Sequence, residues 1–146
     1  MLRIYRYTSV YNRPFDNQTQ PRIWLETLAF GVILQMIEAG DVDLVSSSVL
    51  EYENSRNPFT WRRSWVTHCN ELAKLHQSVN VEIKQRAEEV EQDGLKAMDA
   101  LHVACAEVTE SDYFLTCDDR IIQRYNGENL RVLNPVNFVL EVPGDE

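Results

Sequence analysis

Two aspartates in the second half of the chain could do chemistry, because each stands where a buried element meets a polar loop. Asp99 precedes an apolar helical segment at residues 100–108, and Asp118 follows an apolar, strand-like run at residues 113–116. In parallel α/β sheets, residues just past the carboxyl ends of the strands line the ligand crevice, so we expect Asp118 there and Asp99 within reach of it. The alternative for either residue is a helix N-cap, a role worth about 1 kcal/mol.

Glu51 and Glu53 form another acidic position, near the start of a predicted helix. Residues 41–46 are typical of a short strand, and the spacing of Ser48 and Glu51 is that of a capping box opening the next helix. Glu53 therefore falls early in that helix. The alternative for both glutamates is a solvated first turn, where acidic side chains interact favourably with the helix dipole.

Hydrophobic periodicity predicts the elements that position these acids. Strands are predicted at residues 2–7, 41–46, 113–116 and 130–133. Helices are predicted at residues 21–39, 48–56, 59–76, 81–91, 99–108 and 119–125, with a polar loop at residues 11–20. This order predicts an α/β fold of three layers, α/β/α, with a central parallel sheet.

Length and composition predict one globular domain at residues 1–140, followed by a polar tail at residues 141–146. Of the 146 residues, 44% are hydrophobic and 25% charged, a balance that argues against a disordered chain. No apolar run approaches the ~20 residues of a membrane span, and the N-terminus lacks the apolar core of a signal peptide, so we expect a cytoplasmic protein with no membrane partner. The three cysteines are expected to be reduced thiols.

The net charge of −9 opposes a polyanionic partner, because phosphate binding normally draws on a surplus of Lys and Arg. A nucleic-acid role would therefore need local help. Divalent metal ions could supply it by screening clustered carboxylates.

Four segments resemble the PIN-domain ribonucleases, a family that includes the VapC-type toxins. They are residues 5–16 (YRYTSVYNRPFD), 46–53 (SSSVLEYE), 98–107 (MDALHVACAE) with 114–120 (FLTCDDR), and 132–138 (VLNPVNF). The most specific part is the DALHxA helix followed by the FLTxD strand end. The resemblance spans nearly the whole chain and implies a PIN-like fold.

The resemblance also implies a metal-dependent endoribonuclease that binds RNA and uses Mg²⁺ or Mn²⁺. Motif by motif, the implied catalytic and metal-binding residues are Glu53, Asp99 and Asp118, with Asp119 as an accessory metal ligand. The hydroxyls that fall where the family places polar support for the site belong to Thr8, Ser9 and Thr116. A divalent ion held by carboxylates binds a scissile phosphate and lowers the pKa of a bound water.

Tyr7 departs from the family's pattern. The first strand normally ends in an aspartate, as in YxDTSV, and Tyr7 stands in its place. A phenol with a pKa near ~10 is a poor Mg²⁺ ligand at neutral pH. We expect Tyr7 to point into the crevice, support the site, and donate its hydroxyl to one of the implied catalytic acids. We also expect crowding to raise the pKa of at least one of those acids.

Three functions are compatible with this sequence. The first is an endoribonuclease weakened by the loss of one acid, because Mg²⁺ commonly needs only one or two protein carboxylates. The second is a catalytically inactive PIN-like module that binds RNA or a protein partner. The third is the toxin of a toxin–antitoxin pair, held by an antitoxin protein. The aromatic face of Trp61 and Trp65 also favours a homodimer.

Overall fold

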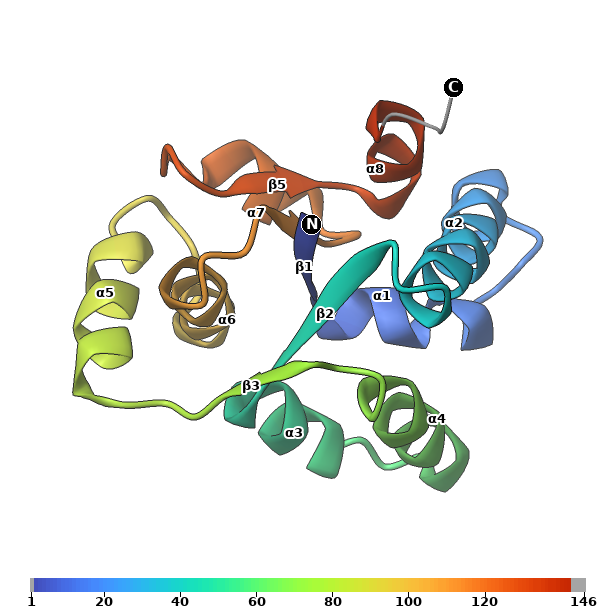
Figure 1. Cartoon of the computed structure of the whole chain (residues 1–146), viewed down its shortest axis with the longest axis horizontal. Coiled ribbons are helices and arrows are strands. Elements are labelled where there is room, and N and C mark those ends of the chain that lie inside the picture. Colours follow the sequence, from blue (N-terminus) through green and yellow to red (C-terminus); the bar gives the residue numbers. More distant parts are fainter. Residues whose placement is uncertain (1, 143–146) are drawn as a thin grey trace.

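A five-stranded parallel sheet in the order β3-β2-β1-β4-β5 forms the centre of the molecule (Figure 1). The computed structural model describes residues 2–142. The strands are β1 (Leu2–Arg6), β2 (Val42–Ser47), β3 (Leu75–Gln77), β4 (Tyr113–Leu115) and β5 (Arg131–Leu133). Every pair of neighbouring strands is parallel, so the carboxyl ends of all the strands lie at the same end of the sheet.

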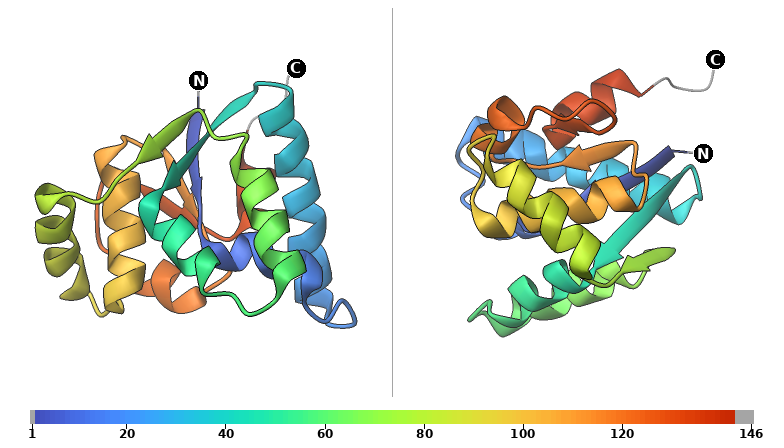
Figure 2. Two further views of the ribbon diagram at one scale, coloured as in Figure 1. Left: turned by 90° about the horizontal axis from the view of Figure 1, so that it is seen from below. Right: turned by 90° about the vertical axis from the view of Figure 1, so that its left-hand side faces the viewer.

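Helices cover both faces of the sheet, as the sequence predicts (Figures 1 and 2). They are α1 (Thr8–Asn12), α2 (Pro21–Glu38), α3 (Ser48–Ser55), α4 (Thr60–Asn70), α5 (Val81–Glu91), α6 (Ala97–Val108), α7 (Asp119–Arg124) and α8 (Pro135–Glu141), with a 3₁₀ turn, η1, at Arg13–Phe15. One core lies between the sheet and α5 and α6, and the other between the sheet and α2, α4 and α8. The three-layer α/β/α fold is therefore confirmed.

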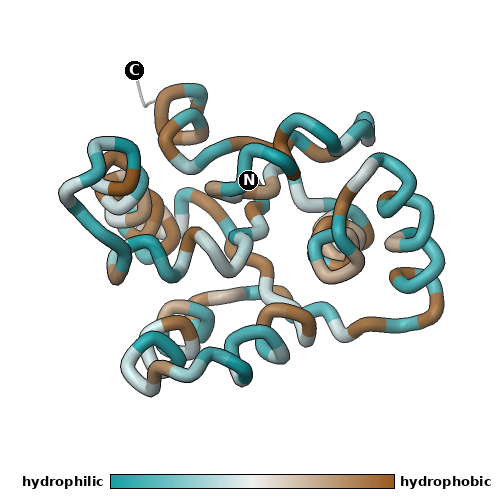
Figure 3. Tube along the Cα trace, turned by 180° about the vertical axis from the view of Figure 1, so that it is seen from behind, coloured by the Kyte–Doolittle hydropathy of each residue, from teal (hydrophilic) through white to brown (hydrophobic). Residues whose placement is uncertain are grey.

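Helix α6 is the most deeply buried helix of the first core. Its fully buried apolar residues lie between the sheet on one side and α5 on the other, and they are Ala100, Val103, Ala104, Cys105 and Ala106. Figure 3 shows the hydrophobic stretches gathered along the inner strands and α6, with hydrophilic ones over the outer turns. This burial fixes the first turn of α6, and with it Asp99, near the carboxyl ends of the strands.

The prediction of one helix at residues 59–76 is wrong. Helix α4 ends at Asn70, and residues 75–77 form the edge strand β3, which pairs with β2. His68 and His76 therefore lie on different elements, and His76 contacts Glu51 rather than a helical neighbour. The segment was misassigned because Leu72 and Leu75 continue the helical spacing of apolar residues, although both are partly exposed.

Three local predictions also need correction. The first part of the polar loop expected at residues 11–20 contains the end of helix α1 and the turn η1. Residues 135–141 form an additional helix, α8. The N-cap of α3 is Ser47, whose hydroxyl accepts a hydrogen bond from the Leu50 amide, and not Ser48. Of the predicted polar tail, Glu141 ends α8, and residues 143–146 lie outside the described residues.

The cysteines are free thiols in the structure, as expected. Cys69, Cys105 and Cys117 are free and buried. Burial raises the pKa of the Cys105 thiol to about 11 and that of Cys117 to about 12, so both remain protonated at neutral pH. Within residues 2–142, no helix combines the length and the apolar composition that a bilayer span requires.

Arg6, the last residue of β1, is a fully buried cation on the α2 side of the sheet. Its guanidinium carbon lies 4.4 Å from the ring centroid of Tyr11 and 4.9 Å from that of Phe30. None of its three guanidinium nitrogens has a hydrogen-bond partner among the described residues. Aromatic contacts recover only part of the cost of removing a cation from water.

We expect an Arg6→Met variant to be more stable than the original chain by about 1–2 kcal/mol, because methionine fills the same space without a buried charge. Urea unfolding measures this difference. Arg3→Met is the matched control on the same strand, where Arg3 donates a hydrogen bond to the Thr109 carbonyl, and it should give no gain. A lower stability for Arg6→Met would mean that the guanidinium has a stabilising partner in solution.

Candidate functional site

Tyr7 is at the centre of the candidate site. It follows β1 directly, and its amide donates to the Leu115 carbonyl at 2.9 Å, which fixes it between β1 and the end of β4. Its hydroxyl donates to Asp99 Oδ1 at 2.5 Å, as expected from the sequence. Burial raises the pKa of Tyr7 far above its usual value, assisted by this bond and by the charges of Glu53, Asp99 and Asp118. Tyr7 is therefore a permanent donor at neutral pH.

Asp99 serves the site and does not cap its helix. Helix α6 has Lys96 as its N-cap, and Asp99 lies inside the first turn. The Asp99 side chain is nearly buried, at 9% exposure, and is turned toward Tyr7. Oδ1 takes the Tyr7 hydrogen bond, and Oδ2 has no hydrogen-bond partner among residues 2–142. The helix-capping alternative is thus wrong for Asp99.

Glu53, in the second turn of α3, is held through one oxygen. Its Oε1 accepts from the Thr8 hydroxyl at 2.8 Å and contacts Nε2 of His102, a fully buried residue of α6. Burial alone would raise the pKa of Glu53, but the hydrogen bonds from His102 and Thr8, with the attraction of His102, leave it below its usual value. Oε2 has no hydrogen-bond partner in the described part of the chain.

Asp118 does cap a helix, and it is held by an arginine. As N-cap of α7, its Oδ1 accepts from the Arg120 amide at 2.9 Å. The Arg120 guanidinium adds hydrogen bonds of 3.2 Å to Oδ1 and 3.1 Å to Oδ2. These bonds from Arg120 lower the pKa of Asp118. Asp118 therefore makes the capping contact, and both of its oxygens have hydrogen-bond partners.

Asp119 is directed away from the other acids. It forms a two-pronged ion pair with Arg22 of α2, at 2.7 and 2.8 Å. Hydrogen bonding from Arg22 lowers the pKa of Asp119. The carboxylate of Asp119, which the resemblance implied as an accessory metal ligand, is therefore bound by Arg22.

The three supporting hydroxyls hold the loops around the acids. Thr8 bonds Glu53, while the hydroxyl of Ser9 accepts from the Cys117 amide at 3.2 Å and that of Thr116 accepts from the Asp118 amide at 3.0 Å. Ser9 and Thr116 thus fix the turn between β4 and α7, and Thr8 orients Glu53 directly.

The acidic trio, which we define as Glu53, Asp99 and Asp118, surrounds Tyr7 without forming a ready-made metal cluster. All three charges act on the Tyr7 hydroxyl. Among residues 2–142, however, no three His, Cys, Asp or Glu side chains gather closely enough to hold one ion. The expected rise in pKa is not found for Glu53 or Asp118, because His102, Thr8 and Arg120 compensate each charge separately.

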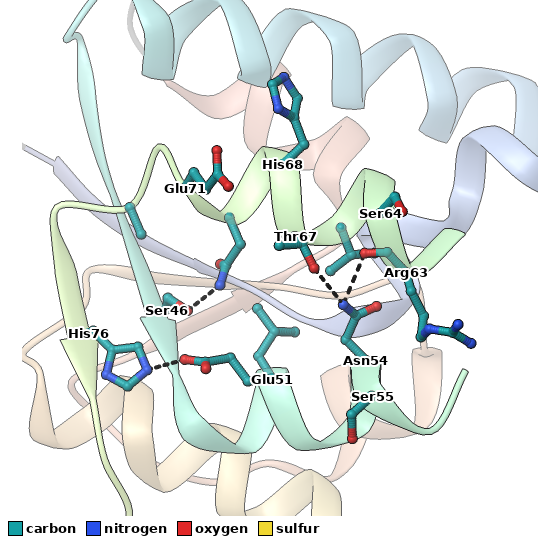
Figure 4. Close-up of a pocket in the computed structure, with 14 residues that line it drawn as sticks. Ser46, Glu51, Asn54, Ser55, Arg63, Ser64, Thr67, His68, Glu71 and His76 are labelled. Carbon is teal, nitrogen blue, oxygen red and sulfur yellow. Dashed lines mark hydrogen bonds and ion pairs between the residues drawn. The ribbon is translucent and has the colours of Figure 1, made fainter. Parts of the chain in front are cut away.

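Open space beside Asp99 is small. The pocket lined by Asp99, Lys96 and Arg120 measures about 10 Å³. A much larger groove of about 830 Å³ lies between α3 and α4 (Figure 4), where the Asn54 amide donates to Thr67 and Glu51 contacts His76. None of the acidic trio lines this groove.

His102 is the site residue that the sequence did not predict. A lone histidine in an apolar helix is most simply read as a core residue, and its burial agrees with that interpretation. The available signal was its place in the DALHxA motif, three residues after Asp99, which puts both side chains on one face of α6.

Comparison with known proteins supports the fold of this chain and shows nothing about its activity. No family model matches the chain, and no curated protein matches it. Among solved structures, it is similar to a chain of VapBC2 from Rickettsia felis, determined bound to a DNA fragment from their promoter. The two share 14% identity, the match covers 91% of this chain and 98% of that one, and the TM-score is 0.59. The fold is therefore PIN-like.

Proposed function

We propose that this protein is a metal-dependent endoribonuclease of the PIN type, with Glu53, Asp99 and Asp118 as its acidic residues. The observation that carries the proposal is that two adjacent residues at the end of β1 bind two of these acids: Tyr7 donates to Asp99 of α6, and Thr8 donates to Glu53 of α3. They stand at the carboxyl edge of a parallel sheet, where ligands of such sheets bind. The PIN-like fold supports the same assignment.

The donor set fits one hard divalent ion, Mg²⁺ or Mn²⁺, with few protein ligands. Glu53 Oε2 and Asp99 Oδ2 are carboxylate oxygens without partners among the described residues, and Mg²⁺ commonly takes only one or two carboxylates. Asp118 could join only by exchanging the Arg120 guanidinium for the ion. When bound, the ion would polarise a scissile phosphate and lower the pKa of a water molecule.

The protein's own residues orient the acids and balance their charge. Thr8 and His102 hold Glu53 through Oε1, and Tyr7 holds Asp99 through Oδ1. Arg120, which is 59% exposed, stands beside Asp118 and offers the nearest cation for an RNA phosphate. These contacts offset some of the repulsion that the net charge of −9 creates toward RNA.

We expect RNA cleavage to require the Asp99 carboxylate. Asp99→Asn keeps an oxygen that can accept from Tyr7 but lacks the charge, so cleavage should fall at least about a hundredfold while the fold is retained. The matched control is Asp112→Asn at the opposite end of β4, where Asp112 accepts from the Arg3 amide. The measurement is cleavage of a labelled RNA with Mn²⁺ or EDTA. Cleavage that survives both EDTA and Asp99→Asn would point to a contaminating nuclease.

The Tyr7–Asp99 hydrogen bond supports a second candidate, a catalytically inactive PIN-like module that binds RNA or a protein partner. In this case Tyr7 replaces the metal as the group that satisfies Asp99. Calorimetry separates the two candidates. Binding of RNA without any binding of Mn²⁺ would favour the inactive module.

The remaining proposal is that this chain binds a partner protein, as the toxin of a toxin–antitoxin pair. It rests on the likeness to a chain of the VapBC2 complex and on exposed apolar residues. Those on α2 are Trp24, Leu25, Leu28 and Val32. Trp61 on α4 is 77% exposed, which also supports a homodimer. Light scattering measures the oligomeric state, and the neighbouring reading frame would reveal an antitoxin.

A further inference from the structure

A continuous chain of hydrogen bonds runs through the core from Ser47 to Glu53. The Tyr5 hydroxyl lies 2.6 Å from Ser47 Oγ and 2.6 Å from His102 Nδ1. On the other side of its ring, His102 contacts Glu53 Oε1 through Nε2. Ser47, Tyr5 and His102 are all fully buried, so water does not replace these partners.

For a neutral His102, the donors and acceptors allow one complete direction along this chain. The Leu50 amide donates to Ser47 Oγ at 3.1 Å. Ser47 can then donate to Tyr5, and Tyr5 can donate to Nδ1 of His102, because each hydroxyl carries one proton. A neutral His102 must in that case carry its proton on Nε2, facing Glu53. In the reverse direction, a neutral His102 would place the lone pair of Nε2 against the carboxylate, so two acceptors would meet.

Packing holds the imidazole in this orientation. The Tyr5 and Tyr7 rings lie edge-on to the His102 ring, with centroid distances of 5.7 and 4.8 Å. Burial raises the pKa of Tyr5 well above its usual value, so its hydroxyl keeps the proton that it donates. Ser47 is the N-cap of helix α3, and Glu53 lies within the same helix. The chain of hydrogen bonds therefore starts and ends at α3.

We propose that His102 is a positioning residue for Glu53, fixed as the Nε2–H tautomer by Tyr5 and Ser47. It holds Oε1, and thereby leaves Oε2 as the single oxygen available to a ligand. The consequence for metal binding rests on the proposed function, whereas the tautomer does not.

The tautomer is tested on the intact protein by ¹⁵N NMR of the imidazole nitrogens at neutral pH. We expect a protonated Nε2 and an unprotonated Nδ1 for His102, with the signal assigned by its loss in His102→Gln. In Tyr5→Phe, which removes only the hydroxyl, Nδ1 loses its hydrogen-bond donor, so its resonance should shift toward that of a free unprotonated nitrogen, while Nε2 stays protonated against Glu53. Tyr113→Phe is the matched control, because it removes a tyrosine hydroxyl from the neighbouring strand β4, where the partner is Glu141. A His102 that carries a proton on Nδ1 in the original chain, alone or together with one on Nε2, would overturn the proposal.

The positioning role is tested by Mn²⁺ titration. His102→Leu removes the donor and should weaken Mn²⁺ binding by about 10–100-fold, as removing an outer-shell partner does. His102→Gln can still donate from its amide to Oε1, and should retain affinity within about threefold. Equal losses in both variants, with the fold intact by circular dichroism, would overturn positioning. If the original chain binds no Mn²⁺, the proposed function fails, and the tautomer measurement alone decides the proposal.

Discussion

Replacing Tyr7 by aspartate is expected to increase Mn²⁺ affinity at least about tenfold and to accelerate RNA cleavage, while lowering stability in EDTA. The new carboxylate would stand at the end of β1 among Glu53, Asp99 and Asp118. Because the Tyr7 hydroxyl contacts Asp99, loss of the ring would also leave open space beside this acid. More carboxylates and more room both favour a divalent ion.

The lower stability of Tyr7→Asp without metal has two causes. The Tyr7 ring packs against His102 at 4.8 Å and Phe114 at 6.0 Å between centroids, and its removal leaves a cavity. The substitution also adds a like charge and removes the donor to Asp99. Together these should cost about 3–5 kcal/mol of unfolding free energy, most of which saturating Mn²⁺ should restore.

The measurement is a paired thermal melt and nuclease assay, with and without Mn²⁺. Tyr7→Phe is the matched control, since it keeps the ring and removes the hydroxyl, and should lose only about 1 kcal/mol with no gain in Mn²⁺ affinity. Should a folded Tyr7→Asp gain neither affinity nor activity, the missing aspartate does not limit this protein. The inactive module would then be the better description.

A Glu26→Gln variant should lose about 2–4 kcal/mol of stability, because Glu26 joins α2 to η1 and to the N-cap of α8 from a fully buried position. Its Oε1 accepts from Arg13 at 2.7 Å, and its Oε2 from Arg22 at 3.1 Å and Asn134 at 2.5 Å. The amide would keep one oxygen as an acceptor and point its hydrogens at the donors on the other side. Arg22 is 51% exposed and can turn to water, so most of the loss should come from the lost charge and from whichever of Arg13 or Asn134 faces the amide nitrogen.

The same residue should make the protein sensitive to acid. Burial raises the pKa of Glu26, but hydrogen bonds from Asn134, Arg13 and Arg22 outweigh it and leave the pKa below its ordinary value of 4.5. A lowered pKa in the folded state means that the stabilisation is complete above pH 4.5 and is lost as the pH falls through the folded-state value.

Urea unfolding between pH 7 and pH 3 measures both effects of Glu26. The difference between the original chain and Glu26→Gln should narrow as the pH falls. Glu38→Gln, at the exposed end of the same helix, is the control and should change stability by less than about 0.5 kcal/mol. A constant difference at all pH values would show that the charge of Glu26 is not what the arginines require.

The sequence predicted most of the fold because the inner strands of a parallel sheet are buried on both faces. The runs around Ile4, Leu44 and Phe114 are almost continuously apolar for this reason. Strand β3 was missed because an edge strand needs no such run: its three residues are Leu75, His76 and Gln77. Only its pairing with β2 distinguishes it from the end of a helix.

The hydrogen bond from Tyr7 to an acid could be predicted from the sequence, but the other partners of the acids could not. Tyr7 lies where a strand end meets the loop after β4, so its approach to an acid followed from topology. The pairing of Asp118 with Arg120 and of Asp119 with Arg22 depends on tertiary geometry, which spacing does not encode. His102 lay within a recognised motif, yet its partner Glu53 is 49 residues away.

The position of β1 in the middle of the sheet has a consequence for synthesis and folding. One neighbour of β1 is β2, but the other is β4, which leaves the ribosome only after more than a hundred further residues. Until then, one edge of β1 is unpaired, and Tyr7 has no Leu115 carbonyl to bind. Such non-local pairing forms slowly. A nascent or truncated chain that lacks β4 therefore cannot assemble the acidic trio. Any nuclease activity would arise only after β4 has paired with β1.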